Sequence, residues 1–373
     1  MWHVDFVKIL IANICVCTSL YMFFPALPGA GLMPDSGLVG VGVSVLAFCA
    51  GMCLPAPFCS YWLDRYRRKS VALWALSGLV GVTSLWGGGL SGWEVYGVRL
   101  AQGAFYGMFQ IAVGSTLLLD LSDTRRRTEA AHVYYWFTRF ALVLGLSAGW
   151  ILSVYYGPRL FAGVAVGLLL CAGVFLWAVR VPFRAPLEPS WCTLDRFWLP
   201  RGFRIFLPLC GVCLAAGMMM ARYREVDFYL FLAVGFWLAL GLHRSLLRDR
   251  LQGEILLGYV CLAGAALWSW LQDGTGGGYW STAMLLGCGL GFVTSRYLLS
   301  YIRICEHCER GTAQTSYLLG WDMGLWAGYA GASSLWGQGD GGDTYYIIGG
   351  LFLVTGLFHG VAVRPWYARN KRK

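Results

Sequence analysis

The sequence is a series of long apolar runs separated by short polar or glycine-rich loops, and this pattern constrains the fold more than any other feature. The runs lie near residues 6–27, 38–60, 70–88, 94–119, 132–155, 159–179, 204–221, 226–243, 253–271, 279–302, 314–336 and 344–363. Most of them approach the ~20 residues that a helix needs to cross a bilayer. Backbone groups in lipid must pair within their own segment, so helices are the expected structure. We predict an all-α polytopic membrane protein with 12 transmembrane helices.

The composition excludes an ordinary soluble domain. Residues of the AVILMFWYC set make up 58% of the chain and charged residues only 13%, whereas a soluble chain carries about 25% charged residues. The 13 cysteines are odd in number and lie mostly inside apolar runs, so they do not indicate a disulfide framework. We expect no metal and no other cofactor.

The basic residues orient the chain in the membrane. If both termini are cytoplasmic, most of the 29 Lys and Arg residues fall in inner segments, and the outer loops hold only Arg159, Arg222 and Arg224. Cytoplasmic loops of membrane proteins carry such an excess of positive charge. We therefore predict cytoplasmic termini. The net charge of +10 follows from this topology and does not indicate a nucleic-acid partner.

The longest connection between runs, residues 181–203, holds four prolines and several arginines. It divides the chain into two predicted domains of six helices each, an N-terminal half at 1–180 and a C-terminal half at 204–373, joined by this cytoplasmic linker. Two equal halves with an inner linker are typical of transporters built from repeats.

The spacing of polar residues and glycines is consistent with such a repeat. Counting 12 residues on from Arg127 and from Arg310 reaches Arg139 and Asp322, two ionisable residues inside the following runs. Counting 18 residues from the same two arginines reaches a matching pair of glycines, Gly145 and Gly328. Short matches of this kind support a repeat without establishing it.

Three motifs carry a resemblance to a known family. The loop after the second run, Ser60-Tyr-Trp-Leu-Asp64-Arg65-Tyr-Arg67-Arg68-Lys69, resembles the G-x-x-x-D-R-x-G-R-[RK] signature of the major facilitator superfamily, with Ser60 and Arg67 in place of its two glycines. The fourth run opens with Arg99-Leu-Ala-Gln102-Gly103, which fits the R-x-x-Q-G pattern of many members. The segment Arg310-Gly-Thr-Ala313 before the eleventh run is also similar to the family. With the 12 runs, the resemblance covers essentially the whole chain and implies the fold of this superfamily.

The resemblance also implies a cytoplasmic latch, a set of charged residues that holds the two halves together on the inner side. It would consist of Asp64, Arg65, Arg68, Asp120, Arg127 and Arg310. Asp64 would meet the N-terminal end of the eleventh helix, where a helix favours negative charge. Arg68 would pair with Asp120. The alternative for such a loop is a solvated run of positive charge.

Several ionisable residues fall inside the runs and are candidates for substrate binding and proton coupling. They are Arg99 with its neighbour Gln102, Arg139, Arg296 and Asp322. The family associates the arginine at the position of Arg99 with proton coupling and the central cavity; the alternative is that it extends its guanidinium towards the headgroups. We interpret Asp322 as the only carboxylate that lies well inside an apolar run. Burial penalises its charged form and a nearby arginine favours it, so either state suits a coupled switch; the alternative is a structural ion pair between helices.

The resemblance implies a secondary transporter that moves a small organic solute by alternating access, with the two halves rocking about a midplane site. The sequence contains no ATP-binding loop, so we expect an ion gradient, in the first place protons, to drive transport. Export is favoured by the R-x-x-Q-G pattern and by Gly145-Leu-Ser-Ala-Gly149-Trp150, which resembles the antiporter motif G-x-x-x-G-P with Trp150 in place of proline.

The expected protein is a monomer in a bacterial inner membrane, with a small-molecule substrate, protons and the lipid bilayer as its partners and no enzymatic activity. Two alternatives stay open at this stage. The first is an importer of a sugar-like nutrient, or a uniporter. The second is a membrane enzyme or a non-transporting receptor that retains the fold.

Overall fold

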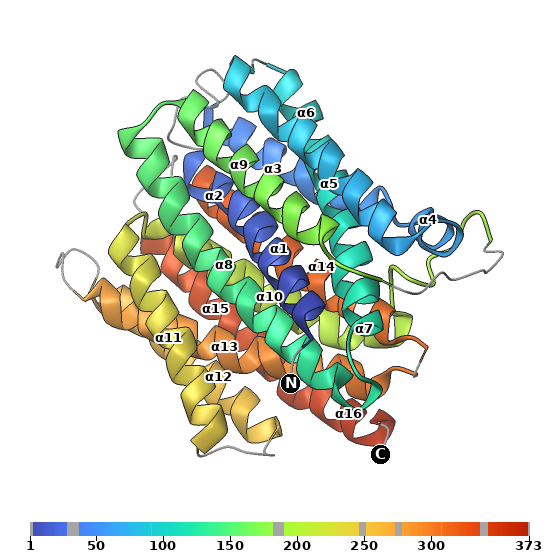
Figure 1. Ribbon diagram of the computed structural model, residues 1–373. Coiled ribbons are helices and arrows are strands. Elements are labelled where there is room, and N and C mark those ends of the chain that lie inside the picture. Colours follow the sequence, from blue (N-terminus) through green and yellow to red (C-terminus); the bar gives the residue numbers. More distant parts are fainter. Residues whose placement is uncertain are drawn as a thin grey trace. The chain divides into compact units, whose positions relative to one another are not determined.

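The computed structural model describes residues 3–27, 37–90, 92–181, 190–245, 251–272, 278–306, 308–335 and 342–371, and the regular structure of these residues is helical (Figure 1). The α-helices are α1 (Val4–Tyr21), α2 (Phe23–Ala26), α3 (Gly37–Cys53), α4 (Cys59–Arg65), α5 (Arg68–Ser84), α6 (Glu94–Gln110), α7 (Leu118–Asp120), α8 (Arg127–Tyr155), α9 (Pro158–Trp177), α10 (Phe203–Arg222), α11 (Val226–Ser245), α12 (Leu251–Leu271), α13 (Tyr279–Ile304), α14 (Arg310–Leu335), α15 (Gly342–Phe358) and α16 (Arg364–Asn370). Two π-helical turns, η2 (Ile111–Leu117) and η5 (His359–Val363), continue α6 and α15, and short 3-10 turns form η1 (Leu85–Gly88), η3 (Thr124–Arg126) and η4 (Pro200–Gly202).

The chain forms two compact units. Unit 1 comprises Met1–Pro200 and Cys305–Ser316, and unit 2 comprises Arg201–Ile304 and Tyr317–Lys373. In the predicted linker at 181–203, the described residues up to Pro200 therefore belong to unit 1. The chain passes from unit 1 to unit 2 again within α14, between Ser316 and Tyr317. The predicted division into halves of six helices each stays a prediction.

Nine helices among the described residues are long and apolar enough to cross a membrane. They are Val4–Ala26, Arg68–Gly88, Thr124–Tyr155, Pro158–Trp177, Pro200–Arg222, Val226–His243, Leu251–Leu271, Tyr279–Ile304 and Thr344–Asn370. The predicted run at 38–60 has only the shorter apolar helix Gly40–Cys53. The helices in the runs at 94–119 and 314–336 carry polar residues such as Arg99 and Asp322. The chain is an integral membrane protein, and the count of 12 spans stays a prediction.

Glycines let the helices of unit 1 approach each other closely. Helix α1 packs against both α8 and α9, and α3 packs against α6 (Figure 1). A Cβ atom added to Gly103 would lie 2.1 Å from the carbonyl oxygen of Phe48, so only glycine fits there. A Cβ atom on Gly145 would lie 2.6 Å from the Cβ of Tyr21. The glycine that resembles part of an antiporter motif thus serves the packing of α8 on α1.

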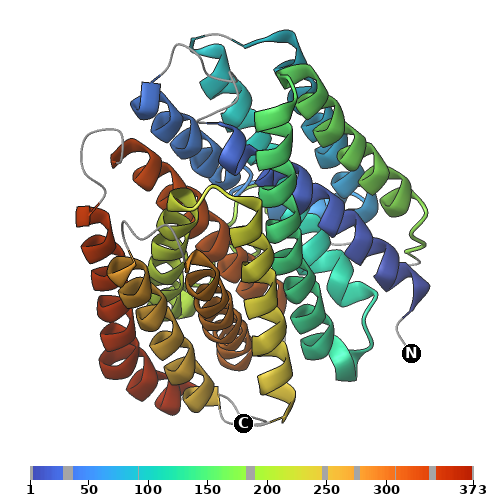
Figure 2. The same ribbon diagram turned by 90° about the vertical axis from the view of Figure 1, so that its left-hand side faces the viewer.

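Unit 2 uses glycines in the same way. Helices α11 and α12 both lie beside α13 (Figure 2), and a Cβ atom on Gly287 of α13 would lie 2.3 Å from the carbonyl oxygen of Leu232 in α11. A Cβ atom on Gly328 of α14 would lie 1.9 Å from the carbonyl oxygen of Leu214 in α10. Gly145 and Gly328, which match in the sequence repeat, therefore each pack on the first long helix of their own unit.

This packing predicts the effect of adding one methyl group. Gly145→Ala and Gly328→Ala should each lower the stability of the protein by about 1–3 kcal/mol, because the added Cβ overfills the contact and pushes two helices apart. Gly163 of α9 is a matched control, since it has no atom within 4 Å of an added Cβ. Gly163→Ala should leave the stability unchanged or raise it slightly. Thermal unfolding of the purified variants checks this, and equal melting temperatures for all three would contradict the packing argument.

Candidate functional site

A polar cavity of about 540 Å³ lies in unit 1, beside the helix ends at Asp64, Arg68 and Asp120. Residues of the linker and the first turn of α14 complete its wall. The charged residues that line the cavity are Asp64, Arg68, Asp120, Arg127, Asp195, Arg196 and Glu309. Four of the six predicted latch residues are among them.

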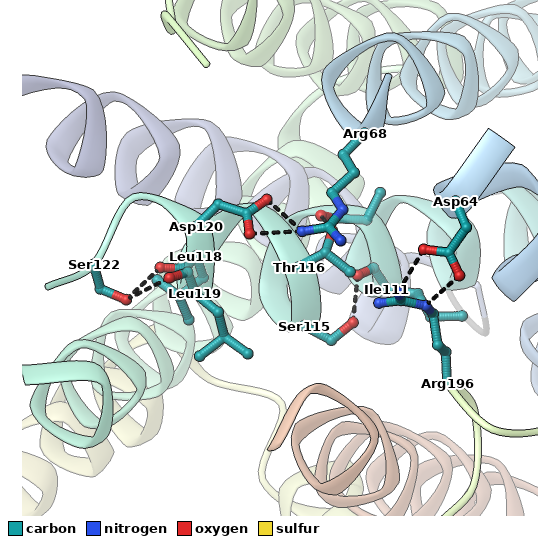
Figure 3. Close-up of polar contacts among 11 residues, drawn as sticks. Asp64, Arg68, Ile111, Ser115, Thr116, Leu118, Leu119, Asp120, Ser122 and Arg196 are labelled. Atoms are coloured by element: carbon teal, nitrogen blue, oxygen red, sulfur yellow. Dashed lines mark hydrogen bonds and ion pairs between the residues drawn. The ribbon is translucent and has the colours of Figure 1, made fainter. Parts of the chain in front are cut away.

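The predicted pair of Arg68 and Asp120 is present. The Nη1 atom of Arg68 donates to both carboxylate oxygens of Asp120, at 2.6 Å each (Figure 3). The two side chains are 15% and 19% exposed, so water only partly screens their attraction. The pair joins the start of α5 to the end of α7.

Asp64 pairs with a residue that the sequence analysis did not single out. The Nη2 and Nε atoms of Arg196 donate to Oδ1 and Oδ2 of Asp64 at 2.5 and 3.1 Å (Figure 3), and the Ser60 hydroxyl donates to Oδ2 at 3.4 Å. The Asp64 side chain is only 8% exposed. Two parallel hydrogen bonds from one guanidinium fix the geometry of this pair. Ser60, where the family has glycine, thus adds a hydrogen bond to the motif.

The first turns of α14 are tied to the same region. The Thr312 hydroxyl donates to the carbonyl oxygen of Asp195, and the backbone N–H of Leu199 donates to the Ser316 hydroxyl at 2.9 Å. A Cβ atom on Gly311 would lie 2.7 Å from the carbonyl oxygen of Ser115, so the glycine of Arg310-Gly-Thr-Ala313 is needed for close contact. Asp64 and this helix end line the same cavity. The hydrogen bonds of Asp64, however, go to Arg196 and Ser60 and not to the helix end.

Two predicted latch residues lie elsewhere. Arg65 is exposed, and its guanidinium lies 5.4 Å from the ring centroid of Tyr61. Arg310 is the first residue of α14 and is half-buried. Neither lines the cavity in the described part of the chain. The family resemblance placed both in the latch, but side chains at successive positions of a helix point in different directions.

A π-helical turn shapes one wall of the cavity. Helix α6 widens into η2 at Ile111–Leu117, where the Ser115 hydroxyl donates to the carbonyl oxygen of Ile111 at 2.5 Å and the Thr116 hydroxyl donates to that of Ala112. Both side chains line the cavity. Single π turns inside α-helices occur frequently at functional sites.

Arg99 lies inside unit 1 and not at the membrane surface. Its side chain is 0% exposed, which excludes the predicted alternative of a guanidinium that reaches the headgroups. The Nη1 atom donates to Oε1 of Gln102 at 3.1 Å, and Nε2 of Gln102 donates to the Thr83 hydroxyl at 3.1 Å. The guanidinium also lies 4.6 Å from the ring centroid of Phe48, a cation–π distance.

Arg139 and Asp322 are also buried. Arg139 of α8 is 1% exposed, and its guanidinium lies 4.7 Å from the ring centroid of Trp136. Asp322 of α14 is 0% exposed and belongs to unit 2. Both were predicted to lie deep in their helices. Their coupling roles stay predictions.

Asp322 is not the only buried carboxylate among the described residues. Glu254 of α12 is 1% exposed and forms an ion pair with Arg296 of α13. Glu254 stands near the start of its apolar run, a position that suggests an interfacial side chain, and α13 covers it. Arg296 therefore has a carboxylate partner within unit 2, Glu254, which the sequence alone did not indicate.

A cluster of uncharged polar side chains in unit 1 was also missed. Asn13 donates to Thr138 at 2.9 Å and accepts from Gln110 at 3.0 Å, and the Tyr134 hydroxyl donates to Gln110 at 3.1 Å. All four are buried and come from α1, α6 and α8. Single polar residues in apolar runs give no sequence signal for such a cluster, because the contacts are long-range.

The comparisons with known proteins agree with this architecture. The sequence model of the Major Facilitator Superfamily matches residues 9–329. The chain belongs to the major facilitator superfamily. It is therefore a membrane transporter and not an enzyme, which excludes the enzyme alternative. A comparison with curated protein sequences finds no match.

Solved structures of other transporters share the fold at low sequence identity. The POT family transporter PepTSo is 13% identical with a TM-score of 0.71, over 99% of this chain and 98% of that chain. The human organic anion transporter MFSD10 (TETRAN) is 15% identical with a TM-score of 0.68, over 95% and 98%. The nucleoside transporter NupG is 14% identical with a TM-score of 0.63, over 95% and 99%.

The Asp64–Arg196 pair predicts a measurable energetic coupling. Arg196→Gln should lower the stability by about 1–3 kcal/mol, because the buried Asp64 carboxylate loses its charged hydrogen-bond donors. The Arg196 side chain is 28% exposed, so water offsets part of the loss. In a double-mutant cycle with Asp64→Asn, thermal unfolding should give a coupling of about 1 kcal/mol or more.

Arg67→Gln is the control for the cycle, since Arg67 is an exposed arginine close by. It should leave the melting temperature within error of the wild type. Strictly additive effects of Asp64→Asn and Arg196→Gln would show that the pair does not interact.

Proposed function

We propose that this transporter exports a small organic solute from a bacterial cell by alternating access, driven by a proton gradient. Its 12 predicted spans would form two halves of six helices in the inner membrane, with both termini in the cytoplasm, and the monomer would be the working unit. The observation that carries the coupling part of the proposal is the burial of Arg99, Arg139 and Asp322, each at most 1% exposed, in a family of transporters.

A coupled transporter needs a group whose charge differs between its conformations, since a proton shifts an equilibrium only through different affinities for the two states. Asp322 can fill this role because a carboxylate in an apolar helix is costly to bury and changes charge when it binds a proton. Arg99 and Arg139 are basic side chains of unit 1 and would set the electrostatic background for a proton or an anionic group of the solute.

The cavity of unit 1 would act as the cytoplasmic gate. Thr312 and Ser316 tie the first turns of α14 to the linker, and Asp322 follows on the same unbroken helix. It lies about two turns beyond Ser316. A change at Asp322 can therefore move the anchored end of a rigid element, and the contacts of the cavity can in turn favour one state of the carboxylate.

Import or uniport of a polar nutrient is the second candidate. It is favoured by the buried cluster of Asn13, Gln110, Tyr134 and Thr138, whose amide and hydroxyl groups are of the type that hydrogen-bonds an uncharged solute. In this structure these groups bond to one another. Flux measurements against a compound panel, in both directions across proteoliposomes, separate the two candidates.

The topology predicts where tags are accessible. Reporters fused at the N-terminus, at the C-terminus and within the 181–203 linker should all report the cytoplasm, because the excess of basic residues lies in these segments. A reporter inserted at Arg159 should report the opposite side. A periplasmic signal from the C-terminal fusion would contradict an even number of spans.

The coupling role of Asp322 predicts a specific transport defect. Asp322→Asn should yield a folded protein that still exchanges substrate but no longer accumulates it against a gradient, because the amide cannot change charge. Arg99→Ala should impair the same step, and Arg99→Lys should restore it only in part, since an ammonium lacks the fork of donors. Solute transport in proteoliposomes, with and without an imposed pH gradient, measures both.

Asp123→Asn serves as the control, because Asp123 is an exposed carboxylate in the loop after α7. It should accumulate solute like the wild type. Full accumulation by Asp322→Asn would make Asp322 a structural residue and would place coupling elsewhere or leave a uniporter.

A further inference from the structure

Three ionisable side chains meet in unit 2, where the end of α11 and the start of α12 pack against α13. Arg296 donates from Nε to Oε2 and from Nη2 to Oε1 of Glu254, at 2.5 Å each. The Nδ1 atom of His243 lies 3.3 Å from both carboxylate oxygens and is also in contact with Nη2 of Arg296. His243 therefore touches both members of a buried ion pair with a single nitrogen atom.

The two contacts of Nδ1 require opposite protonation states. An arginine nitrogen only donates, so the contact with Arg296 is a hydrogen bond only when Nδ1 carries a lone pair. An ionised carboxylate only accepts, so the contact with Glu254 is a hydrogen bond only when Nδ1 carries a proton. In the neutral ring with its proton on Nε2, Nδ1 can accept from Nη2 of Arg296; in the imidazolium, Nδ1 can donate to Glu254.

The histidine is partly exposed, although the ion pair beneath it is buried. The His243 side chain is 27% exposed, whereas the side chains of Glu254 and Arg296 are 2% and 7% exposed. The charged groups that face His243 include Glu254 from α12 and Arg296 from α13. Histidine is the side chain that ordinarily changes charge near neutral pH.

We propose that His243 is a proton-binding site of unit 2 that switches its partner when it is protonated. The lone pair of Nδ1 takes a proton from a hydronium ion, which leaves as water. The new N–H donates to Glu254, while the hydrogen bond from Arg296 is lost and two cations now share one carboxylate. Repulsion between the imidazolium and the guanidinium then favours a rearrangement of α11 against α13.

This site would give the transporter a second protonation point besides Asp322. Its role in transport rests on the proposed proton coupling, but proton binding itself is measurable without transport. The failure of one proposal is therefore distinguishable from the failure of the other.

The test is the ¹⁵N spectrum of the histidine rings in the purified protein, with the His243 signals assigned by their loss in His243→Gln. Near pH 7.5 we expect the neutral ring with its proton on Nε2, and acidification to about pH 5 should convert it to imidazolium. A ring that carries its neutral proton on Nδ1, that is charged at about pH 7.5 or that stays neutral at about pH 5 would overturn the proposal.

Charge-removing variants on the two partners sharpen the test because they have opposite expected effects. At one fixed acidic pH, the imidazolium fraction of His243 should rise in Arg296→Gln, which removes the competing cation. It should fall in Glu254→Gln, which removes the counter-charge. His3→Gln is the control, since His3 is exposed near the N-terminus, and it should leave the His243 signals unchanged. An unchanged fraction in both partner variants would show that His243 titrates independently of the pair.

Discussion

The cost of placing a charge inside an apolar helix is the constraint on which the rest of this structure depends. Arg99 meets Gln102 and the ring of Phe48, and Arg296 meets Glu254. The helices that hold Arg99 and Asp322 are the ones too polar to be recognised as membrane spans by hydropathy. By contrast, α9 contains no charged residue after its first turn and presents Leu170 and other large apolar side chains on its exposed face. The charged residues of the polar helices thus lie in protein contacts, whereas α9 exposes an apolar face of the kind that suits lipid.

Close helix packing is the second constraint, and its glycines agree with the internal repeat that the sequence spacing suggests. Gly145 and Gly328 stand at matching places in the sequence and each contacts the first long helix of its own unit. The ion pairs of the two units do not match in the same way. In unit 1 the arginine of the Arg68–Asp120 pair starts α5, whereas in unit 2 the carboxylate Glu254 lies at the start of α12 and its partner Arg296 lies within α13. Close contact requires a glycine at each of these two places, whereas the ion pairs of the two units differ in the order of their charges along the chain.

The sequence was sufficient for the helical class and the family, because apolar runs and motif spacing are local patterns. The Arg68–Asp120 pair, which joins residues 52 positions apart, was expected only from the family resemblance. It was insufficient for Arg196, since the linker has no periodicity and the contact with Asp64 joins residues 132 positions apart. It was also insufficient for Glu254, whose place at the edge of a run resembles that of an interfacial residue. The cluster around Asn13 and Gln110 depends on contacts between three helices and leaves no trace in any one of them.

We propose that the first turns of α14 are held at the cavity of unit 1 in one transport state and released in another. A short thiol-specific cross-linker between Leu199→Cys and Ser316→Cys, in a background without other accessible cysteines, tests it directly, because the backbone of one residue bonds to the side chain of the other. The account predicts that cross-linking stops solute flux in proteoliposomes and that reduction of a cleavable linker restores it. Full flux through the cross-linked protein would contradict it.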